Sequence, residues 1–251
     1  MADMTALVQN ALENRNLKVV EPEAMPVVPF DVYTQGGDKL GRYYSELGAD
    51  EDDVPIFRAT VGLGGSRDFN ITTGIEDLDK SSTSICGVVF YAHNMNVFFD
   101  EATPGEPPVC VSKDGITGFD RNTEETCDCA SCPRNKPKNG GRRECRNKVR
   151  LYVLTSGTPV PMAIDVPPAS LMAWKKYRYS LRHFGFLEPH EVLTEFTLEA
   201  AVNAQKIKYS KIKLRMLGKL EPEAVQKIEL IQQFFKPEIF EADFEEITNN
   251  D

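Results

Sequence analysis

The chain has 251 residues, of which 41% are hydrophobic and 27% are charged, and this composition is typical of a globular protein. It excludes a chain that is disordered throughout, and no window approaches the roughly 18 uninterrupted apolar residues of a membrane span. Residues 1–20 lack the basic and apolar regions of a secretory signal. We therefore expect a soluble, cytoplasmic protein with no membrane partner.

The net charge of −9 conceals a strong segregation along the chain. Residues 1–133 carry a net charge of −14, residues 134–219 carry 18 basic and 6 acidic side chains for a net +12, and residues 220–251 carry a net −7. A polyanion responds to the charge within a Debye length of about 8–10 Å rather than to the total. The middle third is therefore the candidate binding surface.

The N-terminal region, residues 1–55, is predicted to be an arm. It contains prolines, an acidic run and little periodicity, so we expect a short helix around residues 5–14 followed by extended, partly mobile chain. The pattern then becomes β. Apolar runs at 88–91 and 95–99, separated by His93-Asn94, predict a buried hairpin, and Cys86 is expected to be a small buried side chain.

Strands and one helix are predicted for the basic middle of the chain. Residues 147–154 alternate in hydrophobicity and predict a half-exposed strand with Lys148 and Arg150 on its solvent side. Apolar residues at helical spacing predict a helix over 171–183, with Ser170 as its N-cap.

A second pair of strands is predicted at 192–198 and 212–216, the latter with a fully basic face, followed by a helix over 221–235 and an acidic tail from 238. Short strands with few helices predict a mainly β or α+β fold. The specific expectation is an OB-fold-like barrel, that is, an oligonucleotide-binding Greek-key barrel, with a zinc-stapled insertion and flanking helices.

Five of the six cysteines lie between positions 110 and 145. The Cys129-x2-Cys132 pair can bring two thiolates to one tetrahedral Zn²⁺ at about 2.3 Å, and Cys145 can supply a third. The preferred fourth ligand is Cys110, with Cys127 as the alternative. Four protein ligands leave no open coordination position, so the expected zinc is structural; reduced or disulfide-linked cysteines without metal are the other interpretation.

The basic groups of the middle third are interleaved with aromatic residues, as in proteins that bind single strands. Such proteins combine a cationic groove with rings on which bases stack, each stack being worth about 1–3 kcal/mol. Trp174 can equally be a core residue on the apolar face of its helix. The predicted DNA-binding residues are Arg143, Arg146, Lys148, Arg150, Tyr152, Lys175, Arg178, Tyr179, Arg182, Lys208, Lys211, Lys213 and Arg215.

Motifs for catalysis are not found in the sequence. The three histidines have no metal-ligand spacing, and there is no Walker loop, GxSxG or HExxH. We therefore expect no enzyme activity. Two alternatives are a zinc-containing transcriptional or adaptor protein, which would prefer duplex DNA, and a replication-associated nuclease, which would need a carboxylate set that the sequence does not offer.

Several motifs, in order, resemble a group of tailed-phage and prophage proteins thought to coat single-stranded DNA in replication and recombination. They are PPVCVSKDGITG, CASCP, ECRNKVRLYVL, PPASL with WKKY, and VLTEFTLEAAVNAQKIKYSKI, over about residues 85–220. The plan is similar to that of zinc-containing helix-destabilising proteins, where zinc staples a subdomain onto an OB barrel. The resemblance implies Cys110 as a ligand, because this cysteine precedes the Ser-x-Asp-Gly turn at 112–115.

The resemblance also implies partners, and the residue pattern of the whole chain predicts an order of regions. The partners are single-stranded DNA, replication and recombination proteins that dock on the acidic C-terminus, and further copies of the chain on DNA. We expect an arm at 1–55, a DNA-binding core at 56–220 that includes a zinc subdomain at 108–148, and a C-terminal helix and acidic tail at 221–251.

Overall fold

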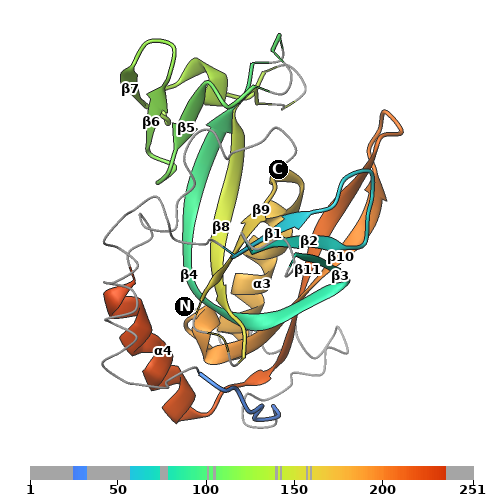
Figure 1. Cartoon of the computed structure of the whole chain (residues 1–251), viewed down its shortest axis with the longest axis vertical. Coiled ribbons are helices and arrows are strands. Elements are labelled where there is room, and N and C mark those ends of the chain that lie inside the picture. The colour runs from blue at the N-terminus through green and yellow to red at the C-terminus, as the bar shows by residue number, and fades with distance from the viewer. Residues whose placement is uncertain are drawn as a thin grey trace, which may run out of the picture.

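The computed structural model describes residues 25–32, 57–73, 79–100, 102–103, 106–138, 141, 143–156, 158 and 160–235. It confirms a mainly β protein with a mixed sheet and few helices (Figure 1). The described strands are β1 (Phe57–Val61), β2 (Phe69–Thr72), β3 (Lys80–Ser82), β4 (Ser84–Phe98), β5 (Cys110–Ser112), β6 (Thr117–Asp120), β7 (Glu125–Asp128), β8 (Arg146–Leu154), β9 (Met162–Val166), β10 (Val192–Val202) and β11 (Lys208–Lys219). The described α-helices are α3 (Leu171–His183) and α4 (Pro222–Phe234), and short 3-10 turns occupy Pro133–Asn135, Pro168–Ser170 and Pro189–Glu191.

Strand β4 is the longest strand and pairs with two long partners. Its first residues pair antiparallel with β10, and the segment from Val88 to Val97 pairs antiparallel with β8, with a register shift between Val89 and Tyr91. The hairpin expected at 88–99 is therefore wrong. His93 and Asn94 continue the ladder opposite Arg150 and Val149, because β8 supplies the partner that a second hairpin strand would have supplied.

The strands form one sheet in the order β3-β2-β1-β9-β8-β4-β5-β6-β7, and β10 joins β4 to β11. The strand pairings within the described residues are antiparallel except that of β1 with β9, and an isolated parallel bridge joins Val27 to Lys219. Figure 1 shows β5–β7 as a projection beyond the ends of β4 and β8, and the β10–β11 hairpin as a second projection. The strand pair predicted at 192–198 and 212–216 is confirmed and extends over 11 and 12 residues.

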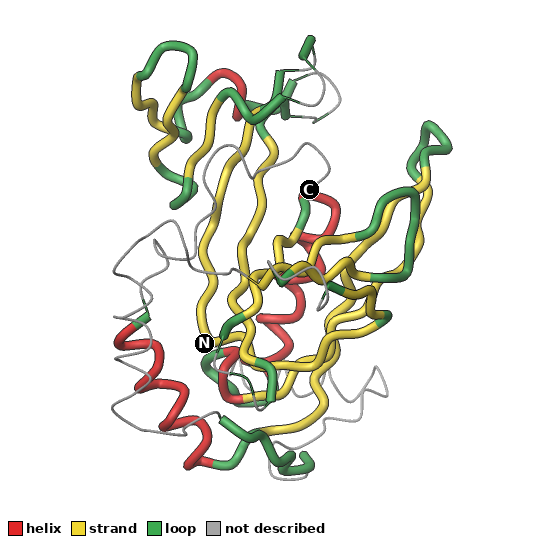
Figure 2. Tube along the Cα trace, viewed as in Figure 1, coloured by secondary structure: helices red, strands yellow, loops and turns green. Residues whose placement is uncertain are grey.

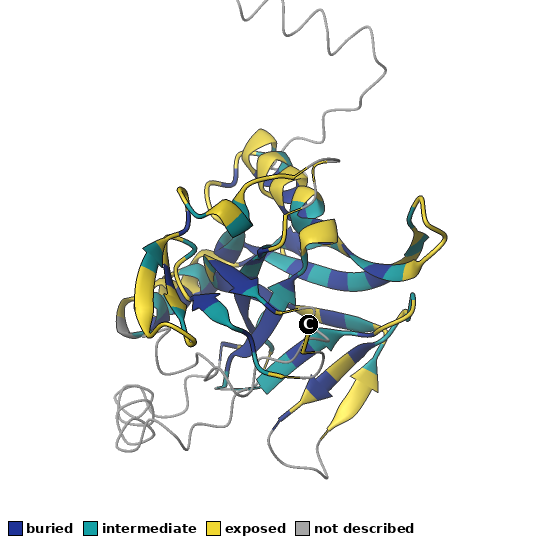
Figure 3. Cartoon of the chain, turned by 90° about the horizontal axis from the view of Figure 1, so that it is seen from above, coloured by how far each residue is buried: buried dark blue, intermediate teal, exposed yellow. Residues whose placement is uncertain are grey.

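Two main apolar clusters lie on opposite faces of β4 and β8. The first includes Leu151, Val153 and Phe196 and is closed by Trp174 and Tyr177 of α3. The second cluster lies under α4, which contributes buried residues such as Ile228. Figure 2 shows α3 among the strands and α4 on the outside of the molecule, and Figure 3 shows exposed positions on the outer side of the helices and at the loop tips.

Helix α3 has the predicted bounds, but Ser170 acts differently from the expected cap. The side chain of Ser170 makes no capping hydrogen bond to the helix. Its Oγ accepts a hydrogen bond from the backbone N–H of Ile212 at 2.9 Å, so it ties the start of α3 to β11. At the other end Gly185 has a φ of +88°, a conformation that favours glycine and ends the helix.

The predicted arm and tail lie largely outside the described residues, as do the helix expected at 5–14 and the acidic segment from 238. Residues 25–32 of the arm do pack on the core. Val28 N–H donates to the carbonyl of Lys219 at 2.9 Å, and Met25 and Val32 are buried. The predicted C-terminal helix is confirmed as α4. No helix within the described ranges combines the length and apolar character that crossing a membrane requires.

A buried ion pair joins β8 to β9. Arg150 Nε and Nη2 donate to the two carboxylate oxygens of Asp165 at 2.7 and 2.9 Å. Burial alone would raise the pKa of Asp165, but the charge and hydrogen bonds of Arg150 outweigh burial and lower it, with Lys148 adding to the effect. Arg150 and Lys148 are 3% and 2% exposed, so their predicted place on the solvent side of the strand is wrong. Tyr152, a ring predicted to bind DNA, is also fully buried. These side chains are buried because they lie against aromatic neighbours and Asp165.

We predict that Arg150→Met lowers the free energy of unfolding by about 3 kcal/mol or more, because it leaves Asp165 without its partner. The folded-state pKa of Asp165 lies below the unfolded value of about 3.9, so the pair stabilises the fold above that pH and the contribution is lost as the pH falls. Denaturant unfolding from pH 7 to pH 3 should show the difference between variant and wild type shrinking. An unchanged stability at pH 7 would contradict this role. The control is Lys213→Met at an exposed ion pair, which should shift stability by less than about 1 kcal/mol.

Candidate functional site

The five clustered cysteines of the sequence come together in the projection formed by β5–β7. Cys110 lies on β5, Cys127 on β7, Cys129 and Cys132 in the turn after β7, and Cys145 immediately before β8. All five line one small cavity of about 20 Å³. Cys129 and Cys145 are buried and the other three are half-buried.

Strand pairing explains this convergence. Gly118 on the middle strand β6 pairs with Cys127, and a Cβ added to Gly118 would lie 3.0 Å from Cys110 Sγ and 3.1 Å from Cys127 Sγ. Only a glycine leaves room for both thiols at this point. Cys110 and Cys127 therefore approach each other across the face of β6.

The turn that carries Cys129 and Cys132 is held by its own hydrogen bonds. Cys132 N–H donates to the carbonyl of Asp128 at 3.1 Å, and the Asp128 carboxylate accepts from the N–H groups of Ala130 and Ser131. Asn135 Nδ2 donates to the carbonyl of Cys129 at 2.8 Å. The C-x2-C segment predicted as a ligand turn is therefore an ordered turn.

Electrostatic interactions link the thiols to one another. Burial, followed by the neighbouring Cys127, raises the pKa of Cys110 to about 12. Burial, followed by Cys129, Cys132 and Cys127, raises the pKa of Cys145 to about 12. Cys127 interacts with each of the other four, whereas the interactions of Cys110 are with Cys127 and Cys145. The five thiols therefore form one cluster around the same cavity.

The thiols share a cavity, but among the described residues no three His, Cys, Asp or Glu side chains stand in positions that would hold a metal ion. The donor chemistry fits zinc, which thiolates bind in tetrahedral sets of four. Cys86 lies apart from this cluster. It is exposed on β4 instead of buried as expected, because successive residues of a strand point to opposite faces and the preceding residue, Ile85, takes the buried side.

The basic residues of α3 gather along a groove about 320 Å³ in volume, here called the α3 groove. Its residues are Asn94, Val149, Leu171, Trp174, Lys175, Arg178, Tyr179 and Arg182. The predicted positions Lys175, Arg178, Tyr179 and Arg182 are thus brought together, since residues three or four apart share one face of a helix. Tyr179 is 59% exposed, as a stacking ring requires.

Trp174 is both a core residue and a residue of the candidate binding groove, which are the two alternatives that its sequence position offered. It belongs to the first apolar cluster and is 5% exposed, yet it also lines the α3 groove. The guanidinium of Arg178 lies 5.9 Å from the centre of the Trp174 ring. The ring therefore positions Arg178 at the groove while its other side fills the core.

A second cavity of about 330 Å³, here called the amide pocket, adjoins the α3 groove and shares Asn94, Val149 and Leu171 with it. Its other residues come from β4, from the 3-10 turn, from β8 and from the cysteine projection: Asn96, Gly115, Ile116, Asp128, Ala130, Asn135, Asn147 and Lys148. The two adjoining cavities define a path from α3 toward the cysteine cluster. The four asparagines of this pocket were missed by the sequence analysis, because isolated Asn residues on separate elements give no pattern.

The basic residues of β11 do not form the fully basic surface that was expected. Lys213 Nζ lies 2.9 Å from Glu199 and Arg215 Nη2 lies 2.8 Å from Glu195, so β10 places acidic residues beside them. The predicted alternation of 192–198 contained this signal, because Glu195 shares the outward side with Arg215. Lys208 is exposed near the hairpin tip, and Lys211 Nζ lies 5.4 Å from the centre of the Tyr209 ring.

The two remaining predicted arginines lie near the cysteine projection. Arg143 is exposed and donates to Asn147 Oδ1 at 3.1 Å, so it stands at the edge of the amide pocket. Arg146 is half-buried, with its guanidinium 5.0 Å from the centre of the Phe99 ring. Of the thirteen predicted residues, the α3 group and Arg143 therefore lie along one path.

Comparison of the chain with protein-family models, with curated proteins and with solved structures finds no match. The site is therefore interpreted from its own residues.

We predict that Gly118→Ala destabilises the cysteine projection by about 1–3 kcal/mol, because the added methyl group would crowd the thiols of Cys110 and Cys127. Limited proteolysis should then cut residues 108–148 faster in the variant than in the wild type. Thr117→Ala is the control, an exposed change on the same strand that should leave the cutting rate unchanged. Equal protection of Gly118→Ala and wild type would show that the projection tolerates the crowding.

Proposed function

We propose that this protein is a non-enzymatic single-stranded DNA-binding protein that coats single strands during phage or mobile-element replication and recombination. The observation that carries the proposal is the α3 groove, where Lys175, Arg178 and Arg182 stand beside an exposed tyrosine ring. Cations along a groove attract phosphates, and an exposed ring stacks on any base, so the combination suits single strands without sequence choice.

The connectivity of six elements supports the finer proposal of an OB-type core. Strands β4, β8 and β9 form an antiparallel meander, α3 separates the third strand from the fourth, β10 returns to pair with β4, and β11 completes a hairpin. In OB folds the loop between the first two strands and the loop between the last two bind oligonucleotides. Here those loops are the cysteine projection and the tip of the β10–β11 hairpin. One departure is that β1 occupies the edge of β9 that would otherwise face β11.

A second departure concerns the binding face. In OB folds the face of the second and third strands also binds the ligand. In this protein α4 covers part of that face and packs on Tyr152, Leu154 and Ala163. We therefore place the single strand in the α3 groove and at the adjoining cysteine projection. We also propose that replication proteins dock on the acidic tail and that the protein associates with further copies of itself on DNA. The acidic tail lies outside the described residues.

We further propose that the cysteine cluster holds one structural zinc ion. Cys129, Cys132 and Cys145 belong to both candidate ligand sets. The fourth ligand is Cys110 in the preferred set and Cys127 in the alternative set, and both thiols lie beside Gly118. When bound, zinc would cross-link the turn after β7 and the start of β8 to β5 or to β7, and it would fix the projection relative to the groove.

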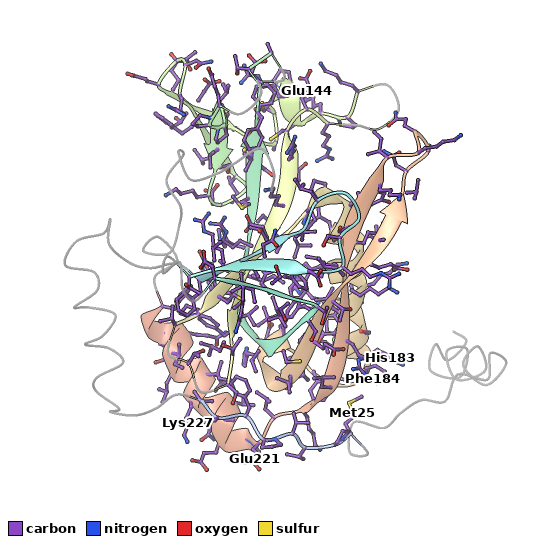
Figure 4. The ribbon with its side chains drawn as sticks, turned by 45° about the vertical axis from the view of Figure 1, so that its right-hand side comes forward. Met25, Glu144, His183, Phe184, Glu221 and Lys227 are labelled. Carbon is purple, nitrogen blue, oxygen red and sulfur yellow. The ribbon has the colours of Figure 1, made fainter. Side chains whose placement is uncertain are left out.

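We predict that Arg178→Glu and Arg182→Glu each weaken binding of a single-stranded oligonucleotide and reduce its salt dependence. Each phosphate contact adds about 0.7 to the slope of log K against log salt for single strands. Fluorescence anisotropy over a salt series measures both quantities. The matched control is Lys227→Glu on α4, where the lysine pairs with Glu223 and lies at the opposite end of the molecule from Glu144 (Figure 4).

Three outcomes of the same titrations would count against the proposal. A salt slope unchanged in both folded α3 variants would remove the groove from the binding site. Tighter binding to duplex than to single strands would favour a transcriptional or adaptor protein. Mg²⁺-dependent loss of the oligonucleotide would favour a nuclease.

We predict one zinc ion per chain, measured by elemental analysis together with thiol titration of the full-length protein. Cys129→Ser should lose the metal, because both ligand sets need this thiol. With Cys110 as the preferred fourth ligand, Cys110→Ser should lose the metal and Cys127→Ser should retain it; the reverse result would assign Cys127 as the ligand. Cys86→Ser is the control and should keep the full metal content, since Cys86 lies outside the cluster.

A further inference from the structure

The Ser-x-Asp-Gly turn between β5 and β6 is locked against β4. Ser112 Oγ donates to Asp114 Oδ1 at 2.9 Å, and the same oxygen accepts from the N–H groups of Ile116 at 2.7 Å and Thr117 at 2.8 Å. Gly115 has a φ of +74°, and a Cβ there would lie 2.6 Å from Asn94 Cβ. The turn therefore sits directly on β4 and carries the next residue, Ile116, to the wall of the amide pocket.

Ile116 is 66% exposed at this position. An exposed isoleucine at the tip of an ordered turn gains nothing for the core of the isolated chain. Val149 and Leu171 provide further apolar surface in the same pocket. Apolar side chains of this kind insert between bases, or pack against them, in several classes of nucleic-acid-binding protein.

A network of amides forms the polar side of the pocket. Asn96, which is 5% exposed, donates through Nδ2 to the carbonyl of Gly115 at 3.1 Å. Asn147 Nδ2 donates to Asn96 Oδ1 and, at 3.0 Å, to Asn135 Oδ1. Arg143 then donates to Asn147 Oδ1. These bonds fix the orientation of the amides before any ligand arrives.

The fixed amides keep hydrogen-bonding capacity. A side-chain amide nitrogen carries two N–H groups. Asn96 and Asn135 each donate one of these N–H groups to a backbone carbonyl. Asn94 is exposed and lines both cavities. Amide side chains can pair with two atoms of a base edge, and single-stranded nucleic acid presents such edges unpaired.

The charges of the pocket argue against a phosphate at this place. Its two charged lining residues are Asp128 and Lys148. The Asp128 carboxylate accepts the N–H groups of the cysteine turn, and Lys148 is 2% exposed with its charge acting on Asp165. The exposed cations are instead next door, in the α3 groove and at Arg143. A volume of about 330 Å³ is at the lower end of the range for small-ligand pockets.

We propose that the amide pocket receives one unstacked nucleobase, packed against Ile116 and read along its edge by Asn94 and the neighbouring amides, while the phosphates follow the α3 groove. The proposal rests on the single-strand binding proposed above and assigns a base subsite to it. Two contacts of different kinds, one apolar and one polar, would then converge on a base and not on the backbone.

The test separates bases from backbone by using two oligonucleotides of about 12 nucleotides, a length within the site sizes of such proteins. One carries natural bases and the other carries abasic sugars with the same phosphates. The full-length variants are Ile116→Ala and Asn94→Ala; the second keeps the Cβ on which Gly115 packs. We expect each to weaken binding of the natural strand about tenfold, as loss of one base contact would, and to leave binding of the abasic strand unchanged.

Controls make the alternatives distinct. Leu230→Ala removes an exposed apolar side chain of α4 and should change neither affinity, while Arg178→Glu should weaken both strands by a similar factor. Equal losses on both strands for Ile116→Ala and Asn94→Ala would mean that these residues touch the backbone, and no loss on either would mean that the pocket is unused. Either result overturns the base subsite and leaves single-strand binding intact. Failure of the wild type to bind any single strand would instead refute the proposed function.

Discussion

Strand β4 pairs with two long strands, β10 and β8. The arrangement of the rest of the chain depends on how the length of β4 is divided between them. Its first residues, up to Gly87, are hydrogen-bonded to β10, and from Val88 to Val97 it pairs with β8, with a register shift between Val89 and Tyr91. Helix α3 closes one face of β4 and β8, and α4 covers the other. The far end of β4 extends beyond the core, where β5 pairs with it and the cysteine projection begins.

The net +12 of residues 134–219 is divided into three environments by this arrangement. On β8, Arg150 and Lys148 turn inward toward Asp165. On β11, Lys213 and Arg215 meet the glutamates of β10. Lys175, Arg178 and Arg182 of α3 line the groove and make no ion pair within the described part of the chain. A large local charge therefore leaves a compact cationic strip, which is a better match for one phosphate chain than for an extended polyanion surface.

The sequence predicted those features that depend on local pattern. Helices α3 and α4, the β10–β11 pair and the gathering of Lys175, Arg178, Tyr179 and Arg182 follow from spacing along a single element. The features that depended on a partner strand were not predictable in this way. His93-Asn94 looks like a turn until β8 is placed beside it, and Lys148 looks exposed until Asp165 approaches from β9. The amide pocket joins residues from five separate segments, so no single stretch of sequence indicates it.

The hydrogen bond from Ile212 N–H to Ser170 Oγ has a mechanical consequence. It fastens the first turn of α3 to the middle of β11, and Tyr177 O–H with Thr194 Oγ1, 2.6 Å apart, adds a second link between the same helix and β10. The helix and the hairpin are thereby hydrogen-bonded to each other at two points. A shift of α3, and with it of the cationic residues of the groove, would therefore require these two hydrogen bonds to break or their partners to move with the helix.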